Sequence, residues 1–250
     1  MTFSQDWMVP ACRHPISETI SQHVYDDRHG DGYKANISYA VTGSELAPLD
    51  RAQHDFAERL IDAAAHTRYE HGTDIDGFIS ISIGFRLLRA GDFASIEASG
   101  NRVTSRPGTQ SFRTTPIYDS WFMHVPTGQL LRFDDLMQYA DVAAESLLHN
   151  GRTVILERFS RIYVSAPTEA ERAEKTDFFA RRISQATGLP SHEWRMSLYF
   201  GDPCAPAILL TFDTKPVDVN NNEYISIHSS LMSWRMFMKP QYRDAIPLVD

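Results

Sequence analysis

Residues 77–85 (GFISISIGF) alternate strictly between large and small side chains. Successive side chains of a β-strand point to opposite faces, so the large residues would share one face of an extended strand: Ile79, Ile81, Ile83 and Phe85. Only small residues would occupy the other face: Ser80, Ser82 and Gly84. We expect the first face to line a core, and the second to meet solvent or a closely packed element.

Similar patterns predict six more strands, at residues 33–41, 92–99, 116–125, 195–200, 207–212 and 223–228. Residues 49–66 instead repeat apolar side chains at helical spacing, and residues 134–147 and 168–187 do the same. Residues 153–165 fit a strand or a helix, and the context favours a helix. Polar, glycine-containing stretches at 25–32 and 100–115 predict loops.

Strands and helices therefore come in separate blocks, which is typical of an α+β fold with an antiparallel β-sheet packed against helices. Residues 77–230 would build one such antiparallel layer. The pattern fits either one domain or two subdomains, and in the second case the boundary would lie near residue 75. The corresponding division is a polar N-terminal arm at 1–32, a strand–helix unit at 33–75 and a sheet with helices at 76–250.

The charge balance limits the classes of partner. The chain has 24 basic and 32 acidic residues, a net charge of −8, which disfavours nucleic acids and anionic membranes and suits a basic protein. No apolar run reaches the length of about 18 residues that a membrane span requires. The first fifteen residues lack the basic and apolar regions of a signal peptide, so we expect no intact signal peptide among them. Cys12 and Cys204 would form a disulfide in an exported protein, or remain two thiols in a cytoplasmic one.

One short segment carries a family resemblance. Thr127-Gly128-Gln129 forms a turn, and Phe133-Asp134-Asp135-Leu136-Met137 opens the helix that follows. Together with the late strands and the ending 224–234, these residues resemble a bacterial extracytoplasmic domain. That domain of unknown function is shared by RsiV, a lysozyme-binding anti-sigma factor, and by PdaC-type peptidoglycan deacetylases. The resemblance covers about residues 33–240 and implies a non-catalytic domain of the periplasm or cell envelope.

The residues offer little for catalysis or metal binding, so we expect no catalytic site, no metal and no cofactor. His66 and His71 are five residues apart and do not form a zinc motif. Asp27, His29 and Asp31 partly imitate a calcium loop, but Ser38 occupies the position of the essential glutamate. His124 and His228 alternate with apolar residues, which is typical of core or edge histidines.

Two polar loops remain as candidates for recognition. One is basic, with Arg102, Arg106 and Arg113. The other is acidic and rich in amides: Asp213, Asp218, Asn220, Asn221, Asn222 and Glu223. With the resemblance, they predict a protein that binds and inhibits a lysozyme-like or other peptidoglycan-cleaving enzyme, as an immunity protein would. The alternatives are a peptidoglycan sensor that stacks sugars on Trp121, Trp194 or Trp234, and a hydrolase with a His/Asp pair.

Overall fold

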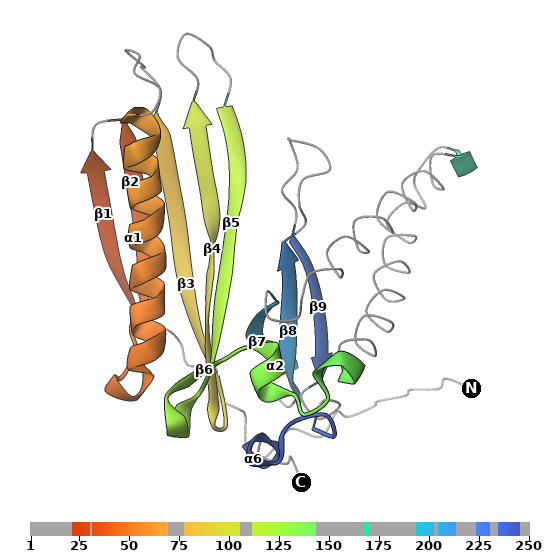
Figure 1. Cartoon of the computed structure of the whole chain (residues 1–250). Helices are drawn as coiled ribbons and strands as arrows, with labels where there is room; N and C mark the ends of the chain where they lie inside the picture. The colour runs from red at the N-terminus through yellow and green to blue at the C-terminus, as the bar shows by residue number, and fades with distance from the viewer. Residues whose placement is uncertain are drawn as a thin grey trace, which may run out of the picture.

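A computed structural model describes residues 22–30, 32–69, 78–105, 112–143, 168–170, 194–202, 205–213, 224–230 and 235–245. The fold is α+β, as the sequence predicts: a six-stranded sheet carries a long helix on one face (Figure 1). A smaller, three-stranded sheet lies beside it. No helix within the described ranges is long and apolar enough to cross a membrane.

The large sheet has its strands in chain order: β1 (His23–Gly30), β2 (Tyr33–Ala40), β3 (Ile79–Ala90), β4 (Phe93–Ser105), β5 (Phe112–His124) and β6 (Gln129–Leu131). Neighbouring strands are antiparallel except β2 and β3, which are parallel. The sheet is therefore mixed, because helix α1 connects β2 to β3 and returns the chain to the same end. It runs without a break across the boundary expected near residue 75.

Helix α1 (Ala47–Tyr69) covers one face of this sheet, after a short 3-10 turn at Ser44–Leu46. The large side chains of β3 lie on that face and are buried, as their alternation predicts. They pack with the apolar side of the helix, including Ala57, Ile61 and Ala64, in one continuous core. Gln53 also bonds both backbone groups of Ala40, at 3.1 and 2.9 Å, which fixes the helix to the end of β2.

The late strands form a second sheet: β7 (Arg195–Asp202), β8 (Ala205–Asp213) and β9 (Tyr224–Ser230). All three were expected as strands, but the single layer over residues 77–230 is wrong. Among the described side chains of this sheet, those of β7 pack on the large sheet: Met196 and Leu198 contact Leu88, Phe93 and Phe122 of β3–β5. The second sheet therefore builds a second core against the large sheet.

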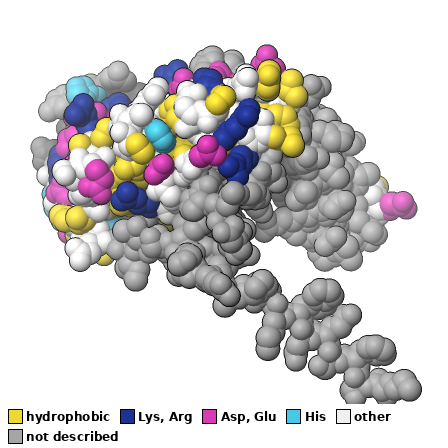
Figure 2. Space-filling view, turned by 90° about the horizontal axis from the view of Figure 1, so that it is seen from below, with side chains coloured by type: hydrophobic (Ala, Val, Ile, Leu, Met, Phe, Trp, Pro, Cys, Tyr) yellow, Lys and Arg dark blue, Asp and Glu magenta, His cyan; other side chains and the backbone are white. Residues whose placement is uncertain are grey.

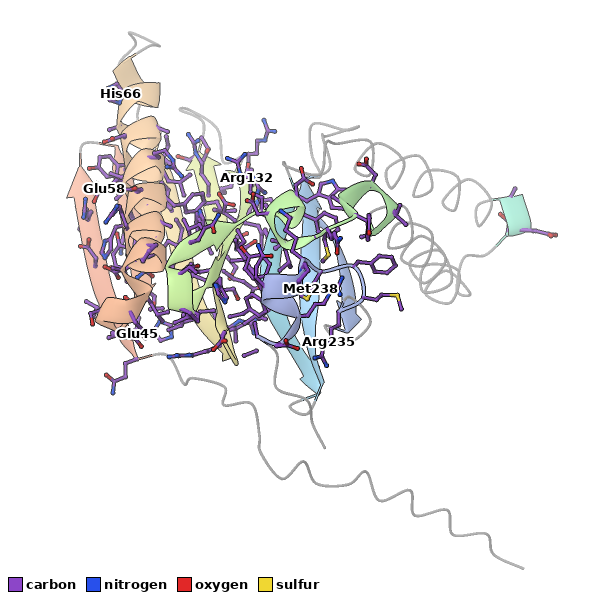
Figure 3. The ribbon with its side chains drawn as sticks, turned by 60° about the horizontal axis from the view of Figure 1, so that its bottom comes forward. Glu45, Glu58, His66, Arg132, Arg235 and Met238 are labelled. Atoms are coloured by element: carbon purple, nitrogen blue, oxygen red, sulfur yellow. The ribbon has the colours of Figure 1, made fainter. Side chains whose placement is uncertain are left out.

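Two short helical segments close this second core. Helix α2 (Phe133–Leu136) buries Phe133 and Leu136, and α6 (Pro240–Arg243) buries Tyr242. Met137 bridges to Met238, so the C-terminal segment lies beside α2 (Figure 3). The helix expected at 134–147 is thus interrupted at Met137 and resumes at residues 140–143, beyond which it leaves the described residues. Its cap position is Arg132, whose N–H donates to Asp135 Oδ2 at 2.9 Å.

Two loop predictions are wrong. Residues 25–30 belong to β1, where all eight positions pair with β2. Residues 100–105 and 112–115 extend β4 and β5 into a long hairpin, since polar side chains suit strands that are solvated on one face. Gly100 allows β4 to lie close to β3, because a Cβ at this position would overlap the backbone of Ser82 in β3.

Candidate functional site

The predicted basic loop is only partly a loop. Arg102 lies in β4 opposite Thr115, and Arg113 lies in β5 opposite Thr104. These cross-strand pairs place Arg102 and Arg113 on the same face of the hairpin, near its end. Arg102 is half-buried and Arg113 is exposed. Arg106 lies outside the described residues, so its position stays a prediction.

The acidic, amide-rich loop follows β8. Asp213 is the last residue of β8 and pairs with Tyr224, the first residue of β9. Asp218, Asn220, Asn221, Asn222 and Glu223 lie between these strands and outside the described residues. Cys12 and Cys204 also lie outside them, so the proposed disulfide stays a prediction.

The two hairpins nevertheless point the same way. The β4–β5 hairpin and the β8–β9 hairpin both end at the upper end of the molecule in Figure 1. The ends of β1 and α1 lie there too, because β1, β4 and β8 all run upward and α1 leads back to the start of β3. The strand ends that flank both predicted recognition loops therefore lie at one end of the molecule.

The two described tryptophans, Trp121 and Trp194, pack against other rings. Trp194 is only 5% exposed, and the centroids of its ring and the Phe133 ring are 4.9 Å apart. The expectation that Trp194 faces solvent is therefore wrong. Trp121 is half-buried against Phe56 of α1, with ring centroids 5.4 Å apart. Trp234 lies outside the described residues.

The remaining candidates for chemistry have structural roles. His124 is buried at the end of β5, where Nδ1 and Thr127 Oγ1 are 2.9 Å apart, beside the rings of Phe93 and Tyr242. It is thus a core histidine, as expected. Asp27 and His29 lie in β1, so they form no calcium loop. Within the described ranges, no three His, Cys, Asp or Glu side chains come close enough to hold a metal ion.

A buried polar cluster between the two sheets was missed by sequence reasoning. Glu97 of β4 is 7% exposed, and its Oε1 accepts a hydrogen bond from Ser197 Oγ of β7 at 2.6 Å. The other oxygen accepts from Arg86 of β3, whose Nε lies 3.1 Å away. The hydroxyl of Tyr118 in β5 also donates a longer hydrogen bond to Glu97 Oε1, at 3.4 Å. Both oxygens of the Glu97 carboxylate therefore accept hydrogen bonds within the fold, which gives this residue a structural role.

Two further contacts join the sheets. The backbone N–H of Leu198 donates to Ser95 Oγ at 2.9 Å, so the edge of β7 that faces away from β8 bonds to a side chain of β4. Arg195 pairs with Asp119 of β5 at 3.1 Å. No local pattern could have revealed these partners, because about a hundred residues separate Ser95 from Leu198.

The face of the large sheet opposite α1 is open beyond this cluster. Ser82, Arg86, Ser99 and Asn101 are exposed there, and a Cβ on Gly84 would meet no atom. The small residues of β3 thus face solvent, which is one of the two outcomes expected for them. Charges of both signs are interspersed on the underside of the molecule, so the described residues form no large patch of one sign there (Figure 2).

The comparisons with known proteins establish the fold. No protein-family model matches the sequence, and no curated protein matches it. Among solved structures, the chain is similar to a DUF3298 family protein of Pseudomonas aeruginosa PAO1, with a TM-score of 0.53 and 12% identity. The alignment covers 95% of this chain and all of the other. A member of the DUF3298 family of Bacteroides fragilis NCTC 9343 aligns at 11% identity over 89% and 93% of the two chains, with a TM-score of 0.45.

The chain therefore has the fold of a DUF3298 family protein, a bacterial domain of unknown function. At this identity the similarity concerns the architecture alone.

Proposed function

We propose that this protein is a non-catalytic binding protein of the bacterial envelope, which binds and blocks a lysozyme-like or other peptidoglycan-cleaving enzyme. The observation that supports the proposal is that the strand ends flanking the two predicted recognition loops lie at the same end of the two packed sheets. Loops held by a rigid scaffold are where proteins usually place their recognition residues.

The internal chemistry supports binding over catalysis. The buried carboxylate of Glu97 is fully engaged by Ser197 and Arg86, and His124 packs among aromatic rings. These groups stabilise the junction between elements, so they are poorly placed to act on a substrate. Recognition then falls to the exposed ends of the strands.

The mechanism of inhibition is steric. Carboxylates and amides of the segment between β8 and β9 would occupy the sugar subsites in the cationic cleft of the hydrolase. The net charge of −8 would accelerate the encounter with a basic enzyme and make association sensitive to salt. The resemblance to the RsiV and PdaC domain supports this class of partner, and the fold of a DUF3298 family protein agrees with a bacterial origin.

The test mixes the purified protein with a cationic muramidase and measures lysis of bacterial cell walls together with complex formation by calorimetry. We expect binding and inhibition to rise together and to weaken as salt is raised from 50 to 300 mM, on the order of tenfold. Unchanged lysis at saturating protein across several peptidoglycan hydrolases would contradict the proposal.

A matched pair of variants locates the contact. The double substitution Asp218→Asn with Glu223→Gln should weaken inhibition, because it removes two charges from the proposed contact. The control, Glu45→Gln with Asp92→Asn, changes the net charge equally at two exposed positions near the opposite end of α1 and β4. Equal losses in both pairs would show that only the overall charge matters.

A further inference from the structure

The outer edge of β1 is open to another strand. The order of the large sheet ends at β1, which pairs with β2 at all eight positions from His23 to Gly30. The strand contains no proline, and its register has no bulge. Proline, bulges, covering elements and charged side chains are the usual protection of a sheet edge. Strand β1 carries charged side chains, but no described element pairs with its outer N–H and C=O groups.

The edge of β7 shows how this chain closes an edge elsewhere. There the Leu198 N–H is bonded by Ser95 Oγ, and Ser197 is held by Glu97. Among the described residues, no side chain makes an equivalent bond to the outer backbone of β1. Within the described ranges, the edge of β7 therefore has specific partners and the outer edge of β1 has none.

The side chains of β1 indicate the chemistry of a partner. Val24 is 59% exposed and Tyr25 is 78% exposed, so apolar surface lies along the strand. Arg28 bonds Asp26 at 2.9 Å and Glu58 of α1 at 2.7 Å, which satisfies these charges within the fold (Figure 3 labels Glu58). Asp27 is exposed, and within the described part of the chain it has no ion-pair partner.

We propose that the outer edge of β1 binds an extended segment of a partner protein as a seventh strand, with a basic side chain opposite Asp27 and, on the other face of the strand, an apolar side chain opposite Val24. Backbone pairing would supply affinity, and the alternate side chains would supply selectivity. In β2, Asn36 lies directly opposite Asp27, and Lys34 lies diagonal to it, opposite His29. The neighbouring strand therefore places no charge directly opposite Asp27.

A second copy of this chain fits the edge less well. In a two-fold symmetric antiparallel pair centred on Asp26 or on Asp27, that carboxylate would lie directly opposite the same residue of the other copy. Like charges directly opposite each other destabilise strand pairing, so self-association is disfavoured at this edge.

The probes for the test are two acetylated, amidated octapeptides, one alternating Val and Lys and the other alternating Val and Glu. Fluorescence anisotropy measures their binding to the full chain, and hydrogen exchange locates it. We expect the Val/Lys peptide to bind and to slow exchange in residues 23–30. Asp27→Lys should weaken that peptide about tenfold and improve binding of the Val/Glu peptide, as cross-strand charge pairs predict.

The control variant Asp55→Lys makes the same charge change at an exposed position of α1 and should leave binding of both peptides within about twofold. Binding of neither peptide, protection outside β1, or equal effects of Asp27→Lys and Asp55→Lys would overturn the proposal. Concentration-dependent dimerisation that protects residues 23–30 would also overturn it, in favour of a second copy. None of these outcomes bears on inhibition of a muramidase, so this inference stands apart from the proposed function.

Discussion

The two faces of the large sheet are covered in different ways. On one face, α1 packs through apolar side chains such as Ala57 and Ile61 over the isoleucines of β3. On the other face, β7 and its neighbours combine an apolar core with the buried Glu97–Ser197 and Ser95–Leu198 contacts. On the α1 side, the buried polar contacts of Gln53 fix the helix at the end of β2, whereas on the other side they lie between the two sheets. A buried polar group left unpaired is costly, so such contacts accept few positions. The polar contacts therefore fix where the second sheet sits.

The largest expected effect tests whether both faces belong to one cooperative unit. Phe85→Ala removes a fully buried ring from the α1 side, and Phe122→Ala removes one from the β7 side. Each should lower the free energy of unfolding by about 3–5 kcal/mol, because each leaves a cavity. Chemical denaturation followed by circular dichroism and by tryptophan fluorescence measures both.

Coincident transitions by the two probes in both variants would mean that the faces unfold together. If the two probes report different unfolding transitions only in Phe122→Ala, the three-stranded sheet unfolds as an independent unit. The boundary between units would then lie between the large sheet and the three-stranded sheet.

A smaller effect should come from the polar contact between the sheets. Glu97→Ala leaves the buried Ser197 hydroxyl without its acceptor and should cost about 2–3 kcal/mol. Ser197→Ala should cost about 1–2 kcal/mol, and the double variant less than the sum, because both remove the same contact. Arg89→Ala is the control, since Arg89 of β3 pairs with the exposed Glu45 at 3.4 Å, and it should cost less than about 1 kcal/mol. Additive losses would contradict a direct role of the Glu97–Ser197 pair.

Two glycines of the central strands should differ in the same assay. A Cβ at Gly100 would overlap the Ser82 carbonyl and lie 2.8 Å from Ile83 Cα, so Gly100→Ala forces the backbones of β3 and β4 apart. We expect a loss of about 1–3 kcal/mol. Gly84→Ala, which meets open space, should change stability by less than about 0.5 kcal/mol. Equal effects would mean that another element covers the open face.

The smallest effect at neutral pH concerns the α1 side. Tyr39 is buried between His54 and Phe85, and its burial raises the pKa of the phenol above the ordinary value. The folded state then holds the proton more tightly than the unfolded state, so this stabilisation is complete below the unfolded pKa of about 10 and declines at higher pH. Tyr39→Phe should be nearly neutral at pH 7 and should reduce the loss of stability between pH 9 and 11, measured by thermal unfolding. An unchanged alkaline profile would contradict this origin.

Much of the fold was predictable because it depends on local periodicity. The alternation in residues 79–85 located β3 and its buried face, and the helical spacing of Phe56, Leu60 and Ile61 located α1. The late strands β7, β8 and β9 were also predicted. These patterns hold within one element, so they can be read without knowing its neighbours.

The arrangement of the elements could not be predicted in the same way. The parallel pairing of β2 and β3, and the separation of β7–β9 into their own sheet, depend on contacts between distant segments. Polar strand residues such as Asp26 and Asn101 resemble loop residues in sequence, and only their pairing shows that they extend β1 and β4. Of the candidate site, Arg102, Arg113 and Asp213 could be placed on the strands, while Glu97 carried no local pattern that would have singled it out.

The central claim is that one end of this two-sheet body holds a peptidoglycan hydrolase without performing a reaction. Hydrogen exchange of the full chain, with and without a saturating cationic muramidase that it inhibits, tests this most directly. The account predicts slower exchange at the ends of the β4–β5 and β8–β9 hairpins, near Ser105, Phe112, Asp213 and Tyr224, with the core strands unchanged. Protection confined to the opposite end, around Gly91 and α6, would contradict it.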